Sequence, residues 1–146
     1  MSLEQWSKNG WLRPHRTNRA QLAELFAIVE RDLDDARTER LSPDWQFGIA
    51  YNAALKLCTI LLYAEGYRPE KTLAHYRTLQ ALPLILGTER QDDADYLDTC
   101  RSKRNTAEYD SAGHISPEEA RELVAFAAEL RATVESWLSE KHPTLA

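Results

Sequence analysis

Residues 42–66, SPDWQFGIAYNAALKLCTILLYAEG, decide the fold of this chain. The stretch opens with Ser42, a proline and an acid, which is typical of a helix start because serine caps the first free N–H groups and proline suits the first turn. Between positions 45 and 64 the only charged residue is Lys56. Apolar side chains therefore occupy all sides of the expected helix, a pattern typical of a helix surrounded by others. We predict a central helix that ends at Gly66.

Four further helices are predicted around the central one. Their apolar residues recur at the spacing of one helical face. The expected segments are residues 17–36, 72–86, 91–109 and 116–138. Pro83 is expected to kink the second of these, and Ser116 to begin the last with a capping box. Since no segment alternates with a period of two, the sequence predicts an all-α, five-helix up-and-down bundle.

The chain has 146 residues, the usual size of one domain. Residues 17–142 are predicted to form that helical domain, preceded by an N-terminal arm at residues 1–16. The arm carries Trp6 and Trp11, which we expect to pack on the domain or on a partner. Without a signal-peptide pattern or a run of about 18 apolar residues, the expected location is cytoplasmic, with no membrane contact.

The formal net charge of −5 argues against a broadly basic surface that coats nucleic acid. Any RNA contact must therefore be local. Cys58 and Cys100 lie in apolar helical patterns without metal-ligand spacing, so we expect both in the core of a protein from a reducing compartment. The acidic run at residues 92–98 starts a predicted helix, where acids complement the helix dipole. No metal and no cofactor are predicted.

Three stretches of the sequence carry a family resemblance. They are AYNAALKLCTILLYAEGYRP at residues 50–69, AHYRTLQALPLILG at residues 74–87 and RSKRNTAEYD at residues 101–110. Together they resemble a bacterial HEPN-domain protein. That superfamily is helical and commonly dimeric, and it includes toxins, antitoxins and defence proteins that act on RNA or pair with a minimal nucleotidyltransferase. The resemblance implies a homodimer with an RNA or nucleotide ligand, or with a nucleotidyltransferase as partner protein.

The ribonuclease members of that superfamily carry Arg-x4-6-His near the end of a late helix, commonly with a polar residue after the arginine. Arg104 and Asn105 match the first half of this motif. Five residues after Arg104 the chain has Tyr109 instead of histidine, as do some relatives that look non-catalytic. The resemblance thus gives Arg104, Asn105 and Tyr109 as candidate catalytic residues.

Metal-independent RNA cleavage requires a protein to hold a phosphate, stabilise its added charge and move protons. Arginine suits the first two tasks because its planar fork binds phosphate oxygens bidentately and stays charged. Histidine, with an ordinary pKa of about 6.5, suits proton transfer, whereas tyrosine at about 10 holds its proton too tightly to act as a base. Tyr109 could donate a proton or hydrogen-bond a phosphate, but it is a poor replacement for a group worth about 10²–10⁴ in rate.

Viewed down the axis of the predicted helix, at about 100° per residue, the side chain of Arg104 points between those of Leu97 and Cys100. Arg104 is therefore expected inside the apolar stripe of this helix. A buried charge needs a partner. The candidates are Glu108 on the same helix, a carboxylate across a dimer interface, and a bound phosphate. Arg101 lies beside Arg104 on the same face, so we predict that these two bind phosphate. The alternative is a structural arginine in an ion pair.

His75, at the start of the predicted helix 72–86, is a third candidate for phosphate binding. Capping and packing explain it more simply, but it could approach Arg104 and supply the missing imidazole. His114 lies in the link before the last helix and is interpreted as a solvated loop residue. Either histidine could take part only through tertiary proximity, which spacing does not predict.

Three functions remain open. The first, which we favour, is a binding module for RNA, a nucleotide or a toxin–antitoxin partner such as a nucleotidyltransferase, without strong catalysis. The second is a metal-independent endoribonuclease in which Tyr109, His75 or His114 replaces the motif histidine. The third is a structural or regulatory helical protein in which Arg104 forms an interfacial ion pair. Phosphate bound by Arg101 and Arg104 would weaken the third, and a carboxylate there would weaken the first two.

Overall fold

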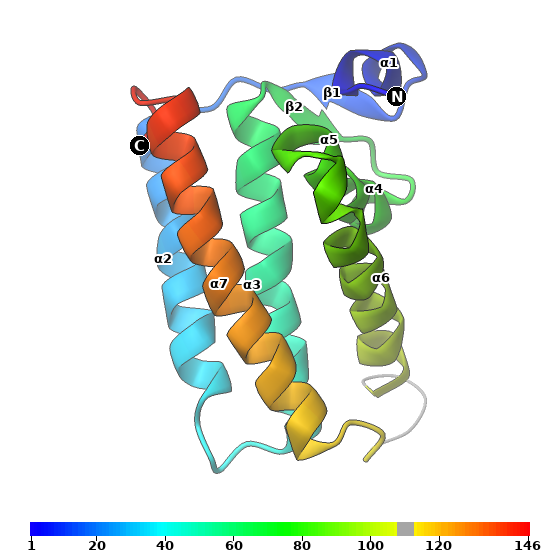
Figure 1. Cartoon of the computed structure of the whole chain (residues 1–146), viewed down its shortest axis with the longest axis vertical. Coiled ribbons are helices and arrows are strands. Elements are labelled where there is room, and N and C mark those ends of the chain that lie inside the picture. Colours follow the sequence, from blue (N-terminus) through cyan, green and yellow to red (C-terminus); the bar gives the residue numbers. More distant parts are fainter. Residues whose placement is uncertain (108–112) are drawn as a thin grey trace.

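The computed structural model describes residues 1–107 and 113–146. Four long helices lie side by side and form a bundle (Figure 1). They are α2 (Arg19–Ala36), α3 (Pro43–Ala64), α6 (Gln91–Asn105) and α7 (Pro117–Lys141). The central helix α3 packs against the other three. The prediction of a mainly helical bundle around residues 42–66 is confirmed.

The start of α3 agrees with the prediction, because the Ser42 hydroxyl accepts a hydrogen bond from a backbone N–H in the first turn at 3.3 Å. By length and composition alone α3 could cross a membrane, but 72% of its most apolar window is buried inside the bundle. One side of the helix is less covered than predicted. Asn52, Lys56 and Thr59 form a half-buried stripe, so α3 is not surrounded on all sides.

The predicted helix at residues 72–86 is divided into two short helices. One is α4 (Ala74–Gln80) and the other is α5 (Leu82–Leu86), and a 3₁₀ turn, η1 (Thr88–Arg90), leads into α6. Pro83 lies in the first turn of α5. Proline has no N–H to donate and its ring crowds the preceding turn, so the expected kink is a full break.

The N-terminal arm is more regular than predicted. Its helix α1 (Leu3–Lys8) is followed by strand β1 (Leu12–Pro14), which pairs antiparallel with β2 (Tyr67–Pro69). The mainly helical class is confirmed, but the all-α prediction did not include this two-stranded sheet. Each strand has only three residues. An alternating pattern becomes recognisable over about four to eight residues, so these strands are too short to show one.

Trp6 anchors the arm in a small hydrophobic cluster of its own. It is 7% exposed and packs with Leu12, Leu62 and Ala81. These four residues are called the arm cluster below. The main core lies between the inward faces of the four long helices. Because Leu62 belongs to α3, the two clusters meet at the C-terminal end of that helix.

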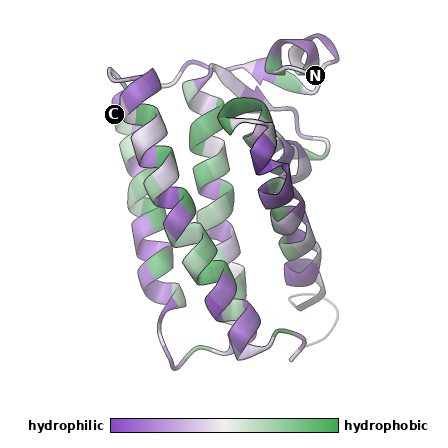
Figure 2. Cartoon of the chain, viewed as in Figure 1, coloured by the Kyte–Doolittle hydropathy of each residue, from purple (hydrophilic) through white to green (hydrophobic). Residues whose placement is uncertain are grey.

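The helix α6 is polar over most of its surface, as Figure 2 shows. Its buried residues are Ala94, Leu97 and Cys100, which confirms the narrow apolar stripe predicted for it. Cys58 of α3 is also buried, and burial raises the pKa of the Cys58 thiol to about 12 and that of Cys100 to about 11. Both cysteines are core residues, as predicted.

Candidate functional site

Arg104 lies near the end of α6, and its side chain contacts α3. Its guanidinium donates hydrogen bonds to Oδ1 of Asn52 at 3.3 Å and to Oδ1 of Asn105 at 3.5 Å. Its Cζ atom is 4.9 Å from the centre of the Tyr51 ring, within the range of a cation–π interaction. The residue is half-buried, which agrees with its predicted place in the apolar stripe. These contacts fix the orientation of the guanidinium.

Tyr51 lies beneath this guanidinium in the core. It is fully buried, and in the described part of the chain its hydroxyl has no hydrogen-bond partner. Burial raises the pKa of Tyr51 to about 12, against a smaller lowering by Arg104 and Arg101. The phenol therefore stays neutral at physiological pH. A buried hydroxyl without a partner costs about 1–3 kcal/mol, so this residue is not explained by core packing alone.

His75 reaches the site from α4. Burial lowers the pKa of His75, and the positive charges of Arg104, Lys56 and Arg101 lower it further. Such repulsion requires that these groups lie near the imidazole, and α3, α4 and α6 pack against one another. The lowered pKa favours the neutral form of the imidazole.

Arg101 lies one turn before Arg104 on α6. Its Nε donates a hydrogen bond to Oδ1 of Asp98 at 2.9 Å, in an ion pair whose side chains are 31% and 32% exposed. This carboxylate partly balances Arg101. The charges of Arg101, Arg104 and Lys56 all act on the His75 imidazole, so these four residues are treated as one group. We call Lys56, His75, Arg101 and Arg104 the cationic cluster.

Two residues named from the sequence lie outside the described part of the chain. They are Tyr109, the predicted replacement for the motif histidine, and Glu108, a predicted partner of Arg104. His114 is exposed in the link before α7. That link is held to the start of α3, because the backbone N–H of Gly113 donates to the carboxylate of Asp44 at 2.7 Å.

Three residues of α3 take part in the site although the sequence did not mark them as candidates: Tyr51, Asn52 and Lys56. A signal for two of them exists in the sequence. Asn52 and Lys56 are polar, four residues apart in an otherwise apolar helix, and so share one face. That spacing predicts an uncovered stripe, but which groups face the stripe depends on how the other helices pack.

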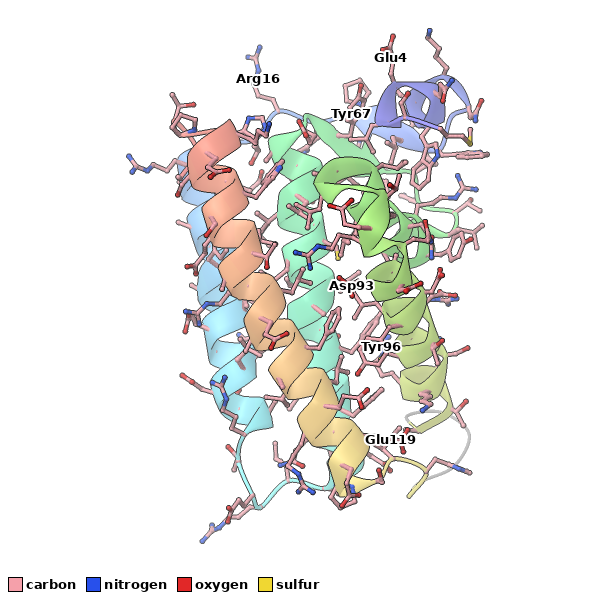
Figure 3. All side chains as sticks on the ribbon, in the orientation of Figure 1. Glu4, Arg16, Tyr67, Asp93, Tyr96 and Glu119 are labelled. Carbon is pink, nitrogen blue, oxygen red and sulfur yellow. The ribbon has the colours of Figure 1, made fainter. Side chains whose placement is uncertain are left out.

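Another face of α6 contacts α7. Figure 3 shows Tyr96 between these two helices and Glu119 near the end of α6. The Tyr96 ring is 4.9 Å from the Phe126 ring, and Lys103 forms an ion pair with Glu119. These contacts hold α6 in the orientation that turns Arg104 toward α3.

Comparison with known proteins identifies no family. No protein-family model matches the chain, and no curated protein or solved structure matches it. Inference about function therefore depends on the cationic cluster and on the sequence resemblance.

Proposed function

We propose that this protein binds the phosphate groups of RNA or of a nucleotide at the cationic cluster. The observation that carries the proposal is the convergence of α3, α4 and α6, each of which contributes basic side chains to one place. The formal net charge of the chain is −5, so its surface as a whole does not attract phosphate. Affinity for phosphate comes mainly from Lys and Arg, and a local cluster supplies it where the overall charge does not.

Arg104 is the residue best suited to contact the phosphate. Its planar fork can bind two phosphate oxygens at once. The Tyr51 ring and the Asn52 amide already hold the guanidinium, so less side-chain freedom is lost on binding. The amide nitrogen of Asn105 is a further donor, because its Oδ1 is the atom that accepts from Arg104.

The bundle is, in this proposal, of the HEPN type. Support comes from the resemblance at residues 50–69, 74–87 and 101–110, and from an Arg-Asn pair at the end of a late helix. The homodimer and the nucleotidyltransferase partner follow from the same resemblance. Light scattering on the purified protein tests the dimer, and a monomer at micromolar concentration would count against it.

Fluorescence anisotropy with a labelled single-stranded RNA tests phosphate binding. We expect Arg104→Ala to weaken binding roughly tenfold or more, and to reduce the slope of affinity against salt by about one. Arg121→Ala is the matched control, because it removes the same charge from a side chain on α7 that is 70% exposed. No binding by the unaltered protein, or equal losses in the two variants, would contradict the proposal.

A second candidate function is metal-independent RNA cleavage. The observation that favours it is the lowered pKa of His75 beside Arg104. A neutral imidazole can take the proton from a 2′-hydroxyl as that oxygen attacks the phosphorus, while Arg104 stabilises the added charge. The imidazolium then returns the proton to the departing 5′-oxygen, leaving a 2′,3′-cyclic phosphate and a 5′-hydroxyl.

Incubation of mixed cellular RNA with the purified protein in excess chelator tests this second function. We expect cleavage by the unaltered protein and by Arg121→Ala, and none by Arg104→Ala or His75→Gln. The Arg121→Ala protein, purified in the same way, controls for contaminating ribonuclease. Cleavage that survives in His75→Gln would exclude His75 as the base, and binding without cleavage would leave phosphate binding as the only function.

A further inference from the structure

The helix α4, which carries His75, has little local stabilisation of its own. It has seven residues, and it begins after Leu73 without a side-chain cap. Leu73 has a φ of +57°, a left-handed conformation that is costly for a residue with a branched side chain, and it is 57% exposed. Isolated helices shorter than about 12 residues are marginal in water. The position of α4 therefore depends on what packs against it.

The N-terminal arm supplies one such contact through stacked side chains. The Cζ atom of Arg77, on α4, is 3.8 Å from the centre of the Trp11 ring and 6.0 Å from that of Trp6. The two tryptophan rings meet edge to face, with centroids 5.8 Å apart. Trp6 also packs with Ala81, which directly follows α4. The arm thus contacts α4 in its middle and at its end.

The arm also holds the segment that leads into α4. The strand β1 pairs with β2, which ends at Pro69. The backbone N–H of Glu70 donates to the carbonyl oxygen of Trp11 at 2.9 Å, and the Glu70 carboxylate pairs with Arg13. The chain that enters α4 and the body of that helix are therefore both attached to the same arm.

The place of His75 depends on this attachment because the residue lies in the first turn of α4. Burial of its imidazole and the positive charges of Arg104, Lys56 and Arg101 lower its pKa, and both effects require that α4 stays packed on α3 and α6. We propose that Trp11 and Arg77 are positioning residues, through which the N-terminal arm holds α4 so that His75 stays within the cationic cluster. Any effect of this positioning on ligand binding rests on the proposed function.

Nuclear magnetic resonance titration of the four histidines tests the placement without any ligand. His75→Gln assigns the His75 signal by its loss. Release of α4 in Trp11→Ala should expose the His75 imidazole and move it away from the arginines, so that its pKa rises toward the ordinary value.

Two further variants separate positioning from simple stability. Arg77→Lys keeps the charge but loses the planar stack on Trp11, so it should also raise the pKa of His75. Trp45→Ala removes a tryptophan that is 60% exposed on α3, outside the arm, and should leave His75 unchanged. An unchanged His75 titration in folded Arg77→Lys and Trp11→Ala, or an equal change in Trp45→Ala, would overturn the proposal.

RNA affinity of the same variants distinguishes this inference from the proposed function. If Trp11→Ala shifts the His75 titration while the unaltered protein binds no RNA, positioning by the arm stands and the proposed function fails. If Arg104→Ala weakens RNA binding while Trp11→Ala leaves the His75 titration unchanged, the proposed function stands and positioning by the arm fails.

Discussion

The two hydrophobic clusters of this protein are built from helices of very different length. The main core draws mostly on α2, α3 and α7, which have 18, 22 and 25 residues, and α6, α4 and α5 add a few residues such as Leu97, Leu79 and Leu82. The arm cluster joins the end of α3 to α1 and to the segment that contains α4 and α5. These three short helices, α1, α4 and α5, have six, seven and five residues. Long helices keep continuous apolar faces buried, whereas short helices depend on their neighbours. Stability therefore resides mainly in one region, and the geometry around His75 depends on the other.

Truncation in the main core should have the largest effect. Leu61 of α3 is fully buried. We expect Leu61→Ala to lower the free energy of unfolding by about 2–5 kcal/mol, through lost burial and the cavity that remains. Urea denaturation measures this change. A loss below about 1 kcal/mol would mean that the main core does not dominate stability.

Truncation in the arm cluster should have a smaller and more local effect. A buried tryptophan replaced by alanine ordinarily costs about 3–5 kcal/mol. For Trp6→Ala we expect less, because the arm can open before the bundle unfolds. Hydrogen exchange should accelerate in the arm and in α4 and stay unchanged in α2 and α7. Equal acceleration in α7 would show that the two clusters form one cooperative unit.

Removal of the Tyr51 hydroxyl tests one polar group within the main core and so refines its comparison with the arm cluster. Because this group is buried without a partner among the described residues, Tyr51→Phe should leave stability unchanged or raise it by up to about 1 kcal/mol. Thermal denaturation measures the change. Destabilisation by about 1 kcal/mol or more would show that the Tyr51 hydroxyl does have a hydrogen-bond partner.

The ion pair between Lys103 and Glu119, which joins α6 to α7, should have the smallest effect. The two side chains are 47% and 35% exposed, so the pair contributes at most about 1 kcal/mol. The hydrogen bond from Lys103 lowers the pKa of Glu119. Stabilisation by the pair is therefore complete above the unfolded carboxyl pKa of about 4.3, and it is lost as pH falls through the lower folded value.

The pH dependence of melting tests this prediction. Lys103→Met should lower the melting temperature slightly at neutral pH and should match the unaltered protein in acid, where Glu119 is protonated. A difference that persists in acid would mean that the effect of Lys103 does not come from its ion pair with Glu119.

The helices could be predicted because their signals act within one turn. Ser42 and Ser116 cap α3 and α7 as their positions in the sequence indicate, and Pro83 interrupts a helix where it stands. The strands could not be predicted in this way. Their partners are far apart along the chain, and neither strand is long enough to show its own periodicity.

The same distinction between local signals and long-range packing applies to the candidate site. Arg101 and Arg104 share a helical face because they are three residues apart, which spacing alone predicts. The approach of His75 to them depends on the packing of three helices, so the sequence could only leave it open. In the sequence, Tyr51 looks like any other aromatic residue of a helical core. Only the structure shows that its buried hydroxyl has no hydrogen-bond partner among the described residues and that the Arg104 guanidinium lies against its ring.

The pairing of β1 with β2 also has a consequence for the order of assembly during synthesis. Leu12 pairs with Pro69, which is 69 − 12 = 57 positions later in the chain. At roughly 5–20 residues per second, the ribosome takes about 3–11 s to produce that partner after Leu12. Throughout that interval Trp6 and Trp11 have no β2 segment or α4 to dock on. The unfinished chain thus presents two unprotected indole rings to the chaperones around the ribosome.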